Sequence, residues 1–363
     1  MMKYIYSFLL LLFFSFYLSA QDSLTVIFAG DAMMHQMQID NARENKSFKL
    51  DGYFPNIAKE VKTANISVVN LEVPLGGEPY SGYPAFSAPD EFAVALQEAG
   101  FNFFLLANNH CLDRGVKGLA RTIHLLDSLG MRSTGIFLDN EQRMRSYPML
   151  LRKNGFRIIM LNYTYDTNGI RIKAPYTVNY IDKEVMAADI AEAKLFNPDF
   201  IIANMHWGIE YSQLPSKGQK ELTDWLFEQG VDLVVGSHPH VVQPMELRKG
   251  EGGLYKQLVV YSLGNFISNM GRENTRVGAM VKVVLCRRRL ERYISSARYV
   301  LVYSEHYKNE RGKESVRVIP SLPPIEMESG DLFFENTVMN QQMKSVRTLL
   351  KINNIDVDEY FVE

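Results

Sequence analysis

Five of the seven histidines in this 363-residue chain follow short apolar runs that are typical of buried β-strands. They are His35, His110, His206, His238 and His240. Carboxylates and amides lie at the same junctions, namely Asp31, Asn70, Glu72, Asn109 and Glu210. Folds of the α/β class build their sites at the carboxyl ends of buried strands, and imidazole, carboxylate and amide oxygen together bind divalent metals. These residues therefore predict a metal centre.

The strongest single motif is His238-Pro239-His240, which follows an apolar run that ends at Gly236. Alternate side chains of an extended segment point the same way, so both imidazoles are expected on one face. They would bind one metal together or one each of two metals, and Gly236 clears space before them. A lone histidine such as His206 is usually a satisfied core residue, but it follows the third strand end of this kind, which favours a metal ligand.

Asp31 and Glu72 would supply the carboxylate ligands. Gly30 lets the chain turn sharply and lets an ion approach closely beside Asp31, although Gly-Asp is also an ordinary turn sequence. Asn70 and Glu72 lie on the same side of an extended segment, because the side-chain period of a strand is two. The Glu72 carboxylate can then bridge two cations; the alternative is a loop that hydrogen-bonds to its own backbone.

Asn108, Asn109 and His110 close a strongly apolar strand. A polar cluster in such a place has to be satisfied by hydrogen bonds or by a ligand. Asp113 has a simpler interpretation, as the N-cap of the helix that follows it. Asn265 ends a later apolar run and is expected to complete the wall of the site.

The segments that carry these residues alternate between strand and helix patterns. The expected strands are 24–29, 66–69 and 101–107, and the expected helices are 54–64, 90–99 and 115–129, with Asp90 and Gly100 as caps of the second helix. This alternation argues for βαβ units and a parallel sheet. The remaining chain is expected to contain two hairpins, at 147–162 and 277–303, and strands at 200–204, 231–235 and 258–262. It is also expected to contain helices at 184–196, 217–228 and 340–351.

The first twenty residues predict a secretory signal peptide. Lys3 precedes an apolar stretch, and small residues allow cleavage after Ala20. The protein is then exported to the periplasm or the extracellular space; the alternative is an uncleaved anchor helix. The economical organisation is a signal peptide at 1–20, one mixed α/β domain at 21–290 and a carboxyl-terminal strand and helix extension at 291–363. An oxidising compartment would allow Cys111 and Cys286 to pair, which spacing alone leaves open.

Composition narrows the function classes. The chain is 47% hydrophobic and 22% charged, which is a normal globular balance. Its net charge of -2 provides no overall field to recruit nucleic acid or an anionic membrane, so no nucleic-acid partner is expected.

Taken together, the motifs resemble the CapA family, named for poly-γ-glutamate capsule synthesis, within the calcineurin-like metallophosphoesterase superfamily. The matching motifs are Gly30-Asp31-Ala32-Met33, Asn70-Leu71-Glu72, Asn109-His110 with Asp113, His206-Trp207-Gly208 with Glu210-Tyr211, Gly236-Ser237-His238-Pro239-His240 and Tyr261-Ser262-Leu263-Gly264-Asn265-Phe266. They occur in the family's order over about residues 24–270.

This resemblance implies an α/β fold in the form of a four-layer αββα sandwich of two mixed sheets. It further implies one or two divalent ions (Mn, Zn or Fe) and a histidine beside them that donates a proton to a leaving group. The implied ligands are Asp31, Glu72, Asn109, His206, His238 and His240, and the implied proton donor is His110. The residues expected to contact substrate or support the ligands are His35, Asn70, Asn108, Glu210 and Asn265.

The sequence departs from the superfamily pattern at three places. Met33 stands where a histidine is usual, with His35 two residues later, and Glu72 replaces the usual bridging aspartate. Cys111 replaces the carboxylate that normally orients the catalytic histidine, and Asp113 is the candidate substitute.

Three functional hypotheses follow. The first is a metal-dependent hydrolase that cleaves a phosphoester or a γ-glutamyl-type amide, with His110 as general acid. The second is a protein without catalytic activity, whose metal centre binds an anionic extracellular polymer and assists a membrane-associated capsule synthesis machinery. The third is a purely structural metal site, which rarely needs so many polar residues at strand ends.

Overall fold

The computed structural model describes residues 22–288, 291–309, 312–323, 325–326, 332–333 and 337–362. The predicted signal peptide and its cleavage position at Ala20 lie outside the described residues. Among the described residues, no helix has the length and apolar character needed to span a membrane.

The first sheet is mixed and contains nine strands in the path β18-β17-β16-β1-β4-β5-β6, with β15 paired to β1 and β21 paired to β17. Its strands are β1 (Asp22–Ala32), β4 (Ile66–Leu71), β5 (Phe103–Leu105), β6 (Arg132–Thr134), β15 (Asn265–Ile267), β16 (Val277–Arg288), β17 (Glu291–Lys308), β18 (Glu314–Pro320) and β21 (Asp358–Glu359). β1, β4, β5 and β6 run parallel, whereas β16, β17 and β18 are antiparallel to their neighbours along this path. The short strand β21 pairs in parallel with β17.

The second sheet has the order β13-β14-β12-β11-β9-β8. Its strands are β8 (Met149–Lys153), β9 (Phe156–Thr164), β11 (Phe200–His206), β12 (Leu233–Ser237), β13 (Met245–Lys249) and β14 (Tyr255–Val260). The central strands are parallel and the two edge strands, β8 and β13, are antiparallel to their neighbours.

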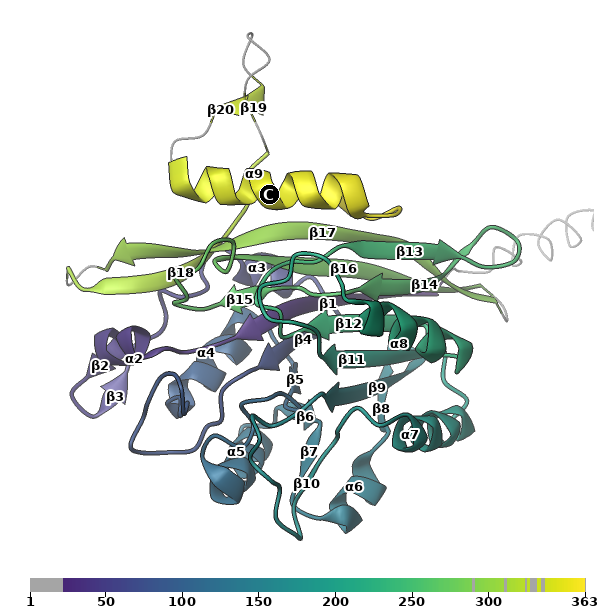
Figure 1. Ribbon diagram of the computed structural model, residues 1–363, viewed down its shortest axis with the longest axis horizontal. Coiled ribbons are helices and arrows are strands. Elements are labelled where there is room, and N and C mark those ends of the chain that lie inside the picture. The colour runs from purple at the N-terminus through teal and green to yellow at the C-terminus, as the bar shows by residue number, and fades with distance from the viewer. Residues whose placement is uncertain are drawn as a thin grey trace, which may run out of the picture.

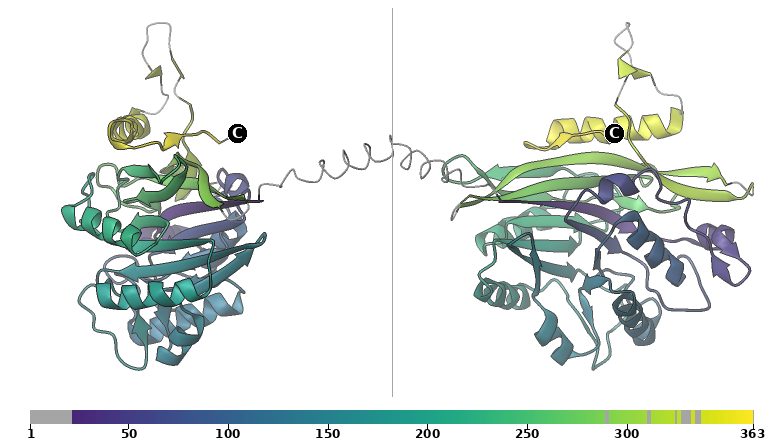
Figure 2. Two further views of the ribbon diagram at one scale, coloured as in Figure 1. Left: turned by 90° about the vertical axis from the view of Figure 1, so that its right-hand side faces the viewer. Right: turned by 180° about the vertical axis from the view of Figure 1, so that it is seen from behind.

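The two sheets face one another and helices cover their outer faces (Figures 1 and 2). The longer helices are α4 (Asp90–Ala99), α5 (Gly115–Ser128), α7 (Lys183–Leu195), α8 (Lys217–Glu228) and α9 (Thr337–Asn353). Helices α4 and α5 pack on the first sheet, and α7 and α8 pack on the second. This four-layer αββα arrangement of two mixed sheets confirms the predicted fold class.

The apolar residues of β1 pack on both faces of the first sheet. Leu24, Val26 and Phe28 point into the core between the sheets, whereas Ile27 and Ala29 point toward the covering helices. Both faces of the strand are buried, so its sequence is a nearly continuous apolar run rather than an alternating one.

Short elements connect these layers. They are α2 (Gln36–Ala42), α3 (Ala58–Val61), α6 (Asn140–Ser146), β2 (Arg43–Glu44), β3 (Ser47–Phe48), β7 (Ile136–Phe137), β10 (Thr177–Val178), β19 (Ile325–Glu326) and β20 (Leu332–Phe333). Helix α9 lies beside β17 at the margin of the two sheets (Figure 1), and Met343, Val346 and Leu350 extend the buried apolar cluster that the sheets share. The domain boundary predicted at residue 290 falls between β16 and β17, which pair along their lengths in one sheet.

Two local predictions are wrong. The helix expected over 54–64 is limited to Ala58–Val61, and turns replace its first half. Pro89, not Asp90, is the N-cap of α4, and the Asp90 carboxylate instead forms an ion pair with Arg121 at 2.7 Å. Gly100 ends that helix with a left-handed φ of 113°, as its sequence position predicts.

Candidate metal centre

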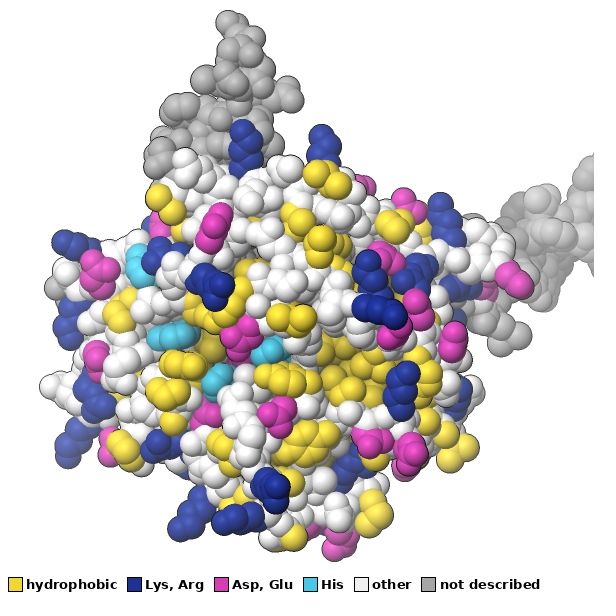
Figure 3. Space-filling view, in the orientation of Figure 1, with side chains coloured by type: hydrophobic (Ala, Val, Ile, Leu, Met, Phe, Trp, Pro, Cys, Tyr) yellow, Lys and Arg dark blue, Asp and Glu magenta, His cyan; other side chains and the backbone are white. Residues whose placement is uncertain are grey.

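The predicted ligand residues meet where parallel strands of both sheets end. Asp31 lies near the end of β1, Glu72 directly follows β4, and His206 is the last residue of β11. His238 and His240 follow β12. Figure 3 shows histidine side chains gathered left of the centre of this face, with acidic and basic side chains beside them.

Five buried side chains form two overlapping groups with the composition of metal sites. One group is Glu72, His206 and His238, and the other is Asp31, Glu72 and His240; the ligand atoms of each group lie within 4.8 Å of one another. The Oε1 atom of Glu72 lies 3.6 Å from His206 Nε2 and 3.9 Å from His240 Nε2. Glu72 is therefore the carboxylate that both groups share, as a bridging ligand would be.

Unpartnered atoms test whether this set fits a metal. Both carboxylate oxygens of Glu72 and the Nδ1 atom of His238 are buried and have no hydrogen-bond partner. Leaving such groups unsatisfied costs about 1–3 kcal/mol each, and more for a charge. Divalent cations would satisfy all three atoms, and imidazole with carboxylate suits Mn, Zn or Fe. The residues thus fit one or two divalent ions.

The two carboxylates have opposite electrostatic environments. Burial, together with the charge of Asp31, raises the pKa of Glu72 well above its usual value. Burial opposes ionisation of Asp31 too, but the hydrogen bond and charge of His240 outweigh it and lower the pKa of Asp31. The Oδ2 atom of Asp31 lies 3.5 Å from His240 Nδ1. Without metal, ionisation is therefore favoured at Asp31 and disfavoured at Glu72.

The histidines of the site also differ in the direction in which their pKa values are shifted. Burial and the charge of His240 lower the pKa of His238 to about 3, and burial lowers the pKa of His206 well below its usual value. Burial also disfavours the charged form of His240, but its hydrogen bond to Asp31 reverses the effect and raises the pKa. His206 and His238 are thus held neutral, which is the state that binds metal.

The geometry expected for His238-Pro239-His240 is wrong in one respect. These residues are not extended, because His238 has a φ of 100° and His240 has a φ of 59°. Both values lie in the left-handed region that non-glycine residues seldom adopt. The loop consequently places the two rings in different ligand groups, with centroids 6.0 Å apart. One ligand on each of two metals is the alternative that this geometry favours.

Amide side chains hold the ligands in place. Asn70 Nδ2 donates to Asp31 Oδ1 at 2.8 Å, and Asn265 Oδ1 lies 3.0 Å from His240 Nδ1. Asn109 Oδ1 lies 2.8 Å from His206 Nε2, which places this predicted ligand at the site. Asn70 and Asn265 therefore orient Asp31 and His240 through their amides.

His110 and Asp113 form a second feature beside the two groups. His110 Nδ1 lies 2.7 Å from Asp113 Oδ2, and both side chains are buried. The same Asp113 oxygen accepts the Phe86 N–H at 2.9 Å, and the Phe86 ring packs edge-on against His110. The capping interpretation of Asp113 is wrong, because the N-cap of α5 is Arg114. Asp113 instead orients His110, and Asn108 Oδ1 accepts the His110 backbone N–H at 3.2 Å.

His35 and Glu210 lie at the edge of this arrangement. His35 Nδ1 accepts the backbone N–H of Asn269 at 3.2 Å, its ring packs against Phe86, and burial lowers its pKa to about 4. The Glu210 side chain is exposed, and its negative charge adds to the raised pKa values of Glu72 and His240. Neither residue belongs to the two ligand groups.

Four further residues of the site were not among the predicted site residues, although two of them, Ser237 and Tyr211, belong to the matching motifs. Tyr165 packs its ring against His238, with centroids 4.5 Å apart, and Ser237 Oγ lies 3.1 Å from His206 Nδ1. Asn168 Oδ1 accepts from Asn109 Nδ2 at 3.2 Å. Tyr211 packs near His240, at a centroid distance of 6.1 Å. Tyr165 directly follows β9, so extending the predicted strand to its true end would have revealed it.

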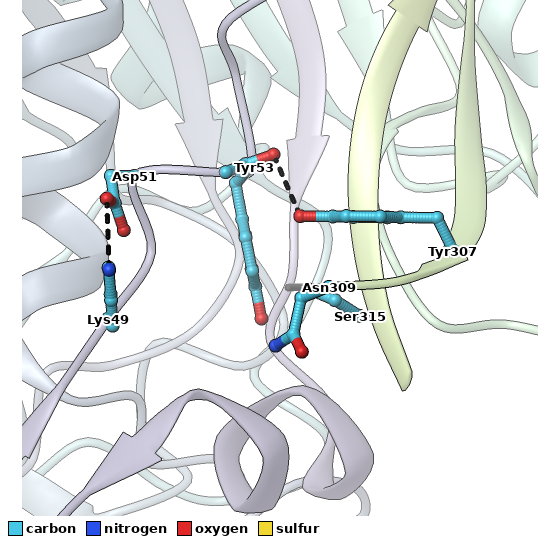
Figure 4. Close-up of a pocket in the computed structure, with 7 residues that line it drawn as sticks. Lys49, Asp51, Tyr53, Tyr307, Asn309 and Ser315 are labelled. Atoms are coloured by element: carbon cyan, nitrogen blue, oxygen red, sulfur yellow. Dashed lines mark hydrogen bonds and ion pairs between the residues drawn. The ribbon is translucent and has the colours of Figure 1, made fainter. Parts of the chain in front are cut away.

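Two other features lie outside the ligand groups. Cys111 and Cys286 are both buried and do not form a disulfide with one another. A cavity of about 220 Å³ lies beside Tyr53 and Tyr307 (Figure 4). The Tyr307 hydroxyl donates a hydrogen bond to the Gly52 carbonyl. None of the residues that line this cavity belongs to the two ligand groups.

Comparison with known proteins identifies the family. The bacterial capsule synthesis protein family PGA_cap matches residues 25–270. The capsule biosynthesis protein CapA of Bacillus anthracis is 30% identical over 275 residues, which are 72% of this chain and 64% of that protein. The PGA biosynthesis protein CapA of Bacillus subtilis is 28% identical over 274 residues, which are 72% of this chain and 68% of that protein. The chain thus spans about two thirds of the length of these curated relatives.

Solved structures with a similar arrangement of elements include the calcineurin-like phosphoesterase YfkN from Bacillus subtilis. That similarity has a TM-score of 0.47 and 13% sequence identity, and it covers 90% of this chain and 97% of that one. The family match spans every residue of the two candidate ligand groups. The chain belongs to the bacterial capsule synthesis protein family PGA_cap, as its resemblance to CapA predicts.

Proposed function

We propose that this protein is an exported metal-dependent hydrolase that acts on an anionic polymer of the cell envelope and takes part in poly-γ-glutamate capsule metabolism. The scissile bond is a γ-glutamyl-type amide or a phosphoester. Membership of the capsule synthesis family and the names of the two Bacillus relatives support the biological setting. The apolar amino-terminal stretch supports export to the periplasm or the extracellular space.

The shared Glu72 carboxylate is the observation that carries the proposal. Its two oxygens are buried without hydrogen bonds, between a group that contains His206 and His238 and a group that contains His240. A purely structural site has no need for two adjacent ligand groups with a common carboxylate. Divalent ions held there would act as Lewis acids that polarise the scissile group and activate water.

The remaining steps belong to residues of the chain. Asp31, Glu72 and the three histidines would hold the metals, and Asn70 and Asn265 keep Asp31 and His240 in position. His110 lies beside this centre and donates a proton from its ring to the leaving group as the bond breaks. Asp113 holds the His110 ring through Nδ1, which leaves Nε2 as the atom that transfers the proton.

Metal analysis followed by a substrate screen tests the proposal. Wild-type protein should contain near-stoichiometric metal, and His240→Ala should contain less. The metal-loaded protein should then hydrolyse a γ-linked glutamate peptide or bis-p-nitrophenyl phosphate, and the variant should not. Absence of metal from the wild type, even after reconstitution, would exclude a metallohydrolase. Bound metal and bound polymer without turnover of either substrate would instead identify a binding protein that assists capsule synthesis.

A further inference from the structure

An arginine lies beside the candidate metal centre and was not among the predicted site residues. The Cζ atom of Arg272 lies 4.0 Å from the centroid of the Tyr211 ring, and the centroids of Tyr211 and His240 are 6.1 Å apart. The guanidinium, the phenol and a candidate metal ligand thus follow one another in space. The Tyr211 ring therefore connects the positive charge to the group formed by Asp31, Glu72 and His240.

Hydrogen bonds connect the turn that carries Arg272 to the candidate metal centre. The Arg272 carbonyl accepts hydrogen bonds from the Thr275 N–H at 3.2 Å and from the Thr275 hydroxyl at 2.6 Å. The carbonyl of the fully buried Thr275 accepts from Asn265 Nδ2 at 2.8 Å, and Asn265 Oδ1 lies 3.0 Å from His240 Nδ1. This chain of contacts fixes the backbone of Arg272 relative to His240.

Tyr211 is fixed as well. Its backbone N–H donates to the carbonyl of Pro239 at 2.8 Å, inside the histidine motif, and its φ is 65°. The backbone that carries the ring is therefore fixed independently of the Arg272 turn, and the guanidinium packs on the face of that ring. Stacking of this kind uses the face of the guanidinium and leaves its N–H edges available for hydrogen bonds.

The edges of the guanidinium have no anionic partner within the part of the chain that the structure describes. The contacts of Arg272 there are its stacking on Tyr211 and its backbone hydrogen bonds to Thr275. The side chain is exposed to solvent. An arginine that is positioned but not paired with a carboxylate can bind an anion of the substrate with two parallel hydrogen bonds.

From these contacts we infer that Arg272 is the residue that recognises a free carboxylate of the substrate next to the scissile bond, and that the substrate is a γ-glutamyl amide. Each unit of a γ-linked glutamate chain keeps an α-carboxylate that takes no part in the amide bond. In a phosphodiester, by contrast, the negative charge lies on the group that reacts. Arg272 lies outside the two ligand groups, so its charge suits an α-carboxylate that does not react rather than a phosphate that does. This inference rests on the proposed hydrolase function.

The reaction is then a hydrolysis that balances without any further reagent. Water adds to the γ-carbonyl carbon, and the bond between that carbon and the amide nitrogen breaks. The amine leaves with a proton from His110, and the proton lost by water restores the histidine. The products are a γ-carboxylate and a new free α-amine, and Arg272 holds the α-carboxylate throughout without reacting.

Binding measurements on the full metal-loaded protein test the inference. The probes are a γ-linked tri-glutamate and its analogue in which the α-carboxylates are amidated. Arg272→Gln should weaken binding of tri-glutamate about tenfold or more, because it removes a charged hydrogen-bonded pair. The same substitution should leave binding of the amidated analogue unchanged, which a merely structural role of Arg272 would not predict. Arg272→Lys should recover part of the loss.

A matched control and the kinetics make the test decisive. Arg145→Gln removes another exposed arginine, on α6, and should leave binding of tri-glutamate unchanged. In turnover of tri-glutamate, Arg272→Gln should raise KM and leave kcat nearly the same. Equal losses for tri-glutamate and the amidated analogue would overturn the inference, as would equal binding of tri-glutamate to wild type and Arg272→Gln.

The outcomes also separate the inference from the proposed function. If wild-type protein hydrolyses tri-glutamate while Arg272→Gln binds and cleaves it equally well, the hydrolase stands and the role of Arg272 is wrong. If no substrate is hydrolysed but binding depends on both Arg272 and the α-carboxylates, recognition stands and the hydrolase is wrong.

Discussion

The Nδ1 atom of His110 lies 2.7 Å from the Oδ2 atom of Asp113, three residues later in the chain. Both side chains are buried, and the Phe86 ring packs edge-on against the imidazole. One ring nitrogen is thereby fixed to a carboxylate, which determines the direction of the other. This pair reproduces, from a different position in the sequence, the carboxylate support that Cys111 cannot provide.

His110→Ala should therefore slow turnover without removing metal. A general acid contributes about 10²–10⁴-fold to rate, so kcat should fall by that order. Asp113→Asn should cause a smaller fall, because the imidazole remains but loses its orienting charge. The measurements are kcat on a γ-linked peptide and metal content by elemental analysis. His124→Ala, which alters an exposed histidine of α5, is the control, and loss of metal from His110→Ala would contradict this role.

Metal stoichiometry should separate the two ligand groups. His238→Ala removes a ligand from one group only, and His240→Ala removes a ligand from the other, so each variant should retain about half of the wild-type metal. Glu72→Gln alters the ligand that both groups share and should retain the least. Elemental analysis after identical loading gives the comparison. Equal metal content in Glu72→Gln and wild type would show that Glu72 is not a ligand, and Glu210→Gln is the matched control because Glu210 lies outside both groups.

The stability of the metal-free protein should fall with rising pH because of Glu72. Its pKa is raised in the folded state above the model value of 4.5, so the folded protein binds more protons there than the unfolded chain once the pH exceeds that value. The free energy of unfolding then decreases as the pH rises. Glu72→Gln lacks this effect and should gain stability relative to wild type by up to about 1.4 kcal/mol per pH unit.

Urea unfolding of both metal-free proteins between about pH 5 and about pH 7 measures this difference. His206 and His238 act in the opposite direction, because their lowered pKa values cost stability as the pH falls below 6.5. Both proteins contain these histidines, so the effect cancels in the comparison. A stability difference that does not change with pH would show that the Glu72 carboxyl is not buried without metal.

Gly236→Ala should destabilise the fold near the site. An added Cβ would lie 2.0 Å from the Tyr261 carbonyl oxygen and 2.5 Å from Trp207 Nε1, and the carbonyl belongs to a backbone that cannot move aside. Overpacking of this kind costs about 1–3 kcal/mol or more. Gly218→Ala in α8 is the control, since it meets only an ordinary contact and should stabilise that helix by about 0.5–1 kcal/mol. Thermal unfolding of both variants provides the measurement.

Local sequence determined the layers and the positions of the ligands along the chain. Buried parallel strands are short apolar runs, and each is followed by the polar residues that its carboxyl end presents, so Asp31, Glu72 and His206 could be placed at strand ends. The same logic predicted βαβ units and a parallel sheet, whereas the two mixed sheets were implied by the resemblance to the CapA family. The apolar spacing was a less accurate guide to the helix expected over 54–64, because spaced apolar residues are also typical of a loop that packs against the core.

Tertiary structure alone decided how those residues combine. The left-handed backbone of His238 and His240 sends their rings to different groups, and a strand-period argument cannot show this because the period applies only to extended chain. Asp113 lies near His110 through a turn rather than through a helix cap. Arg272 stacks on Tyr211, which lies far from it in the sequence, and is linked to Asn265 only through Thr275. The sequence therefore specified which chemical groups reach the sheet edge, whereas their distances, shared contacts and charges arose only from packing between the two sheets.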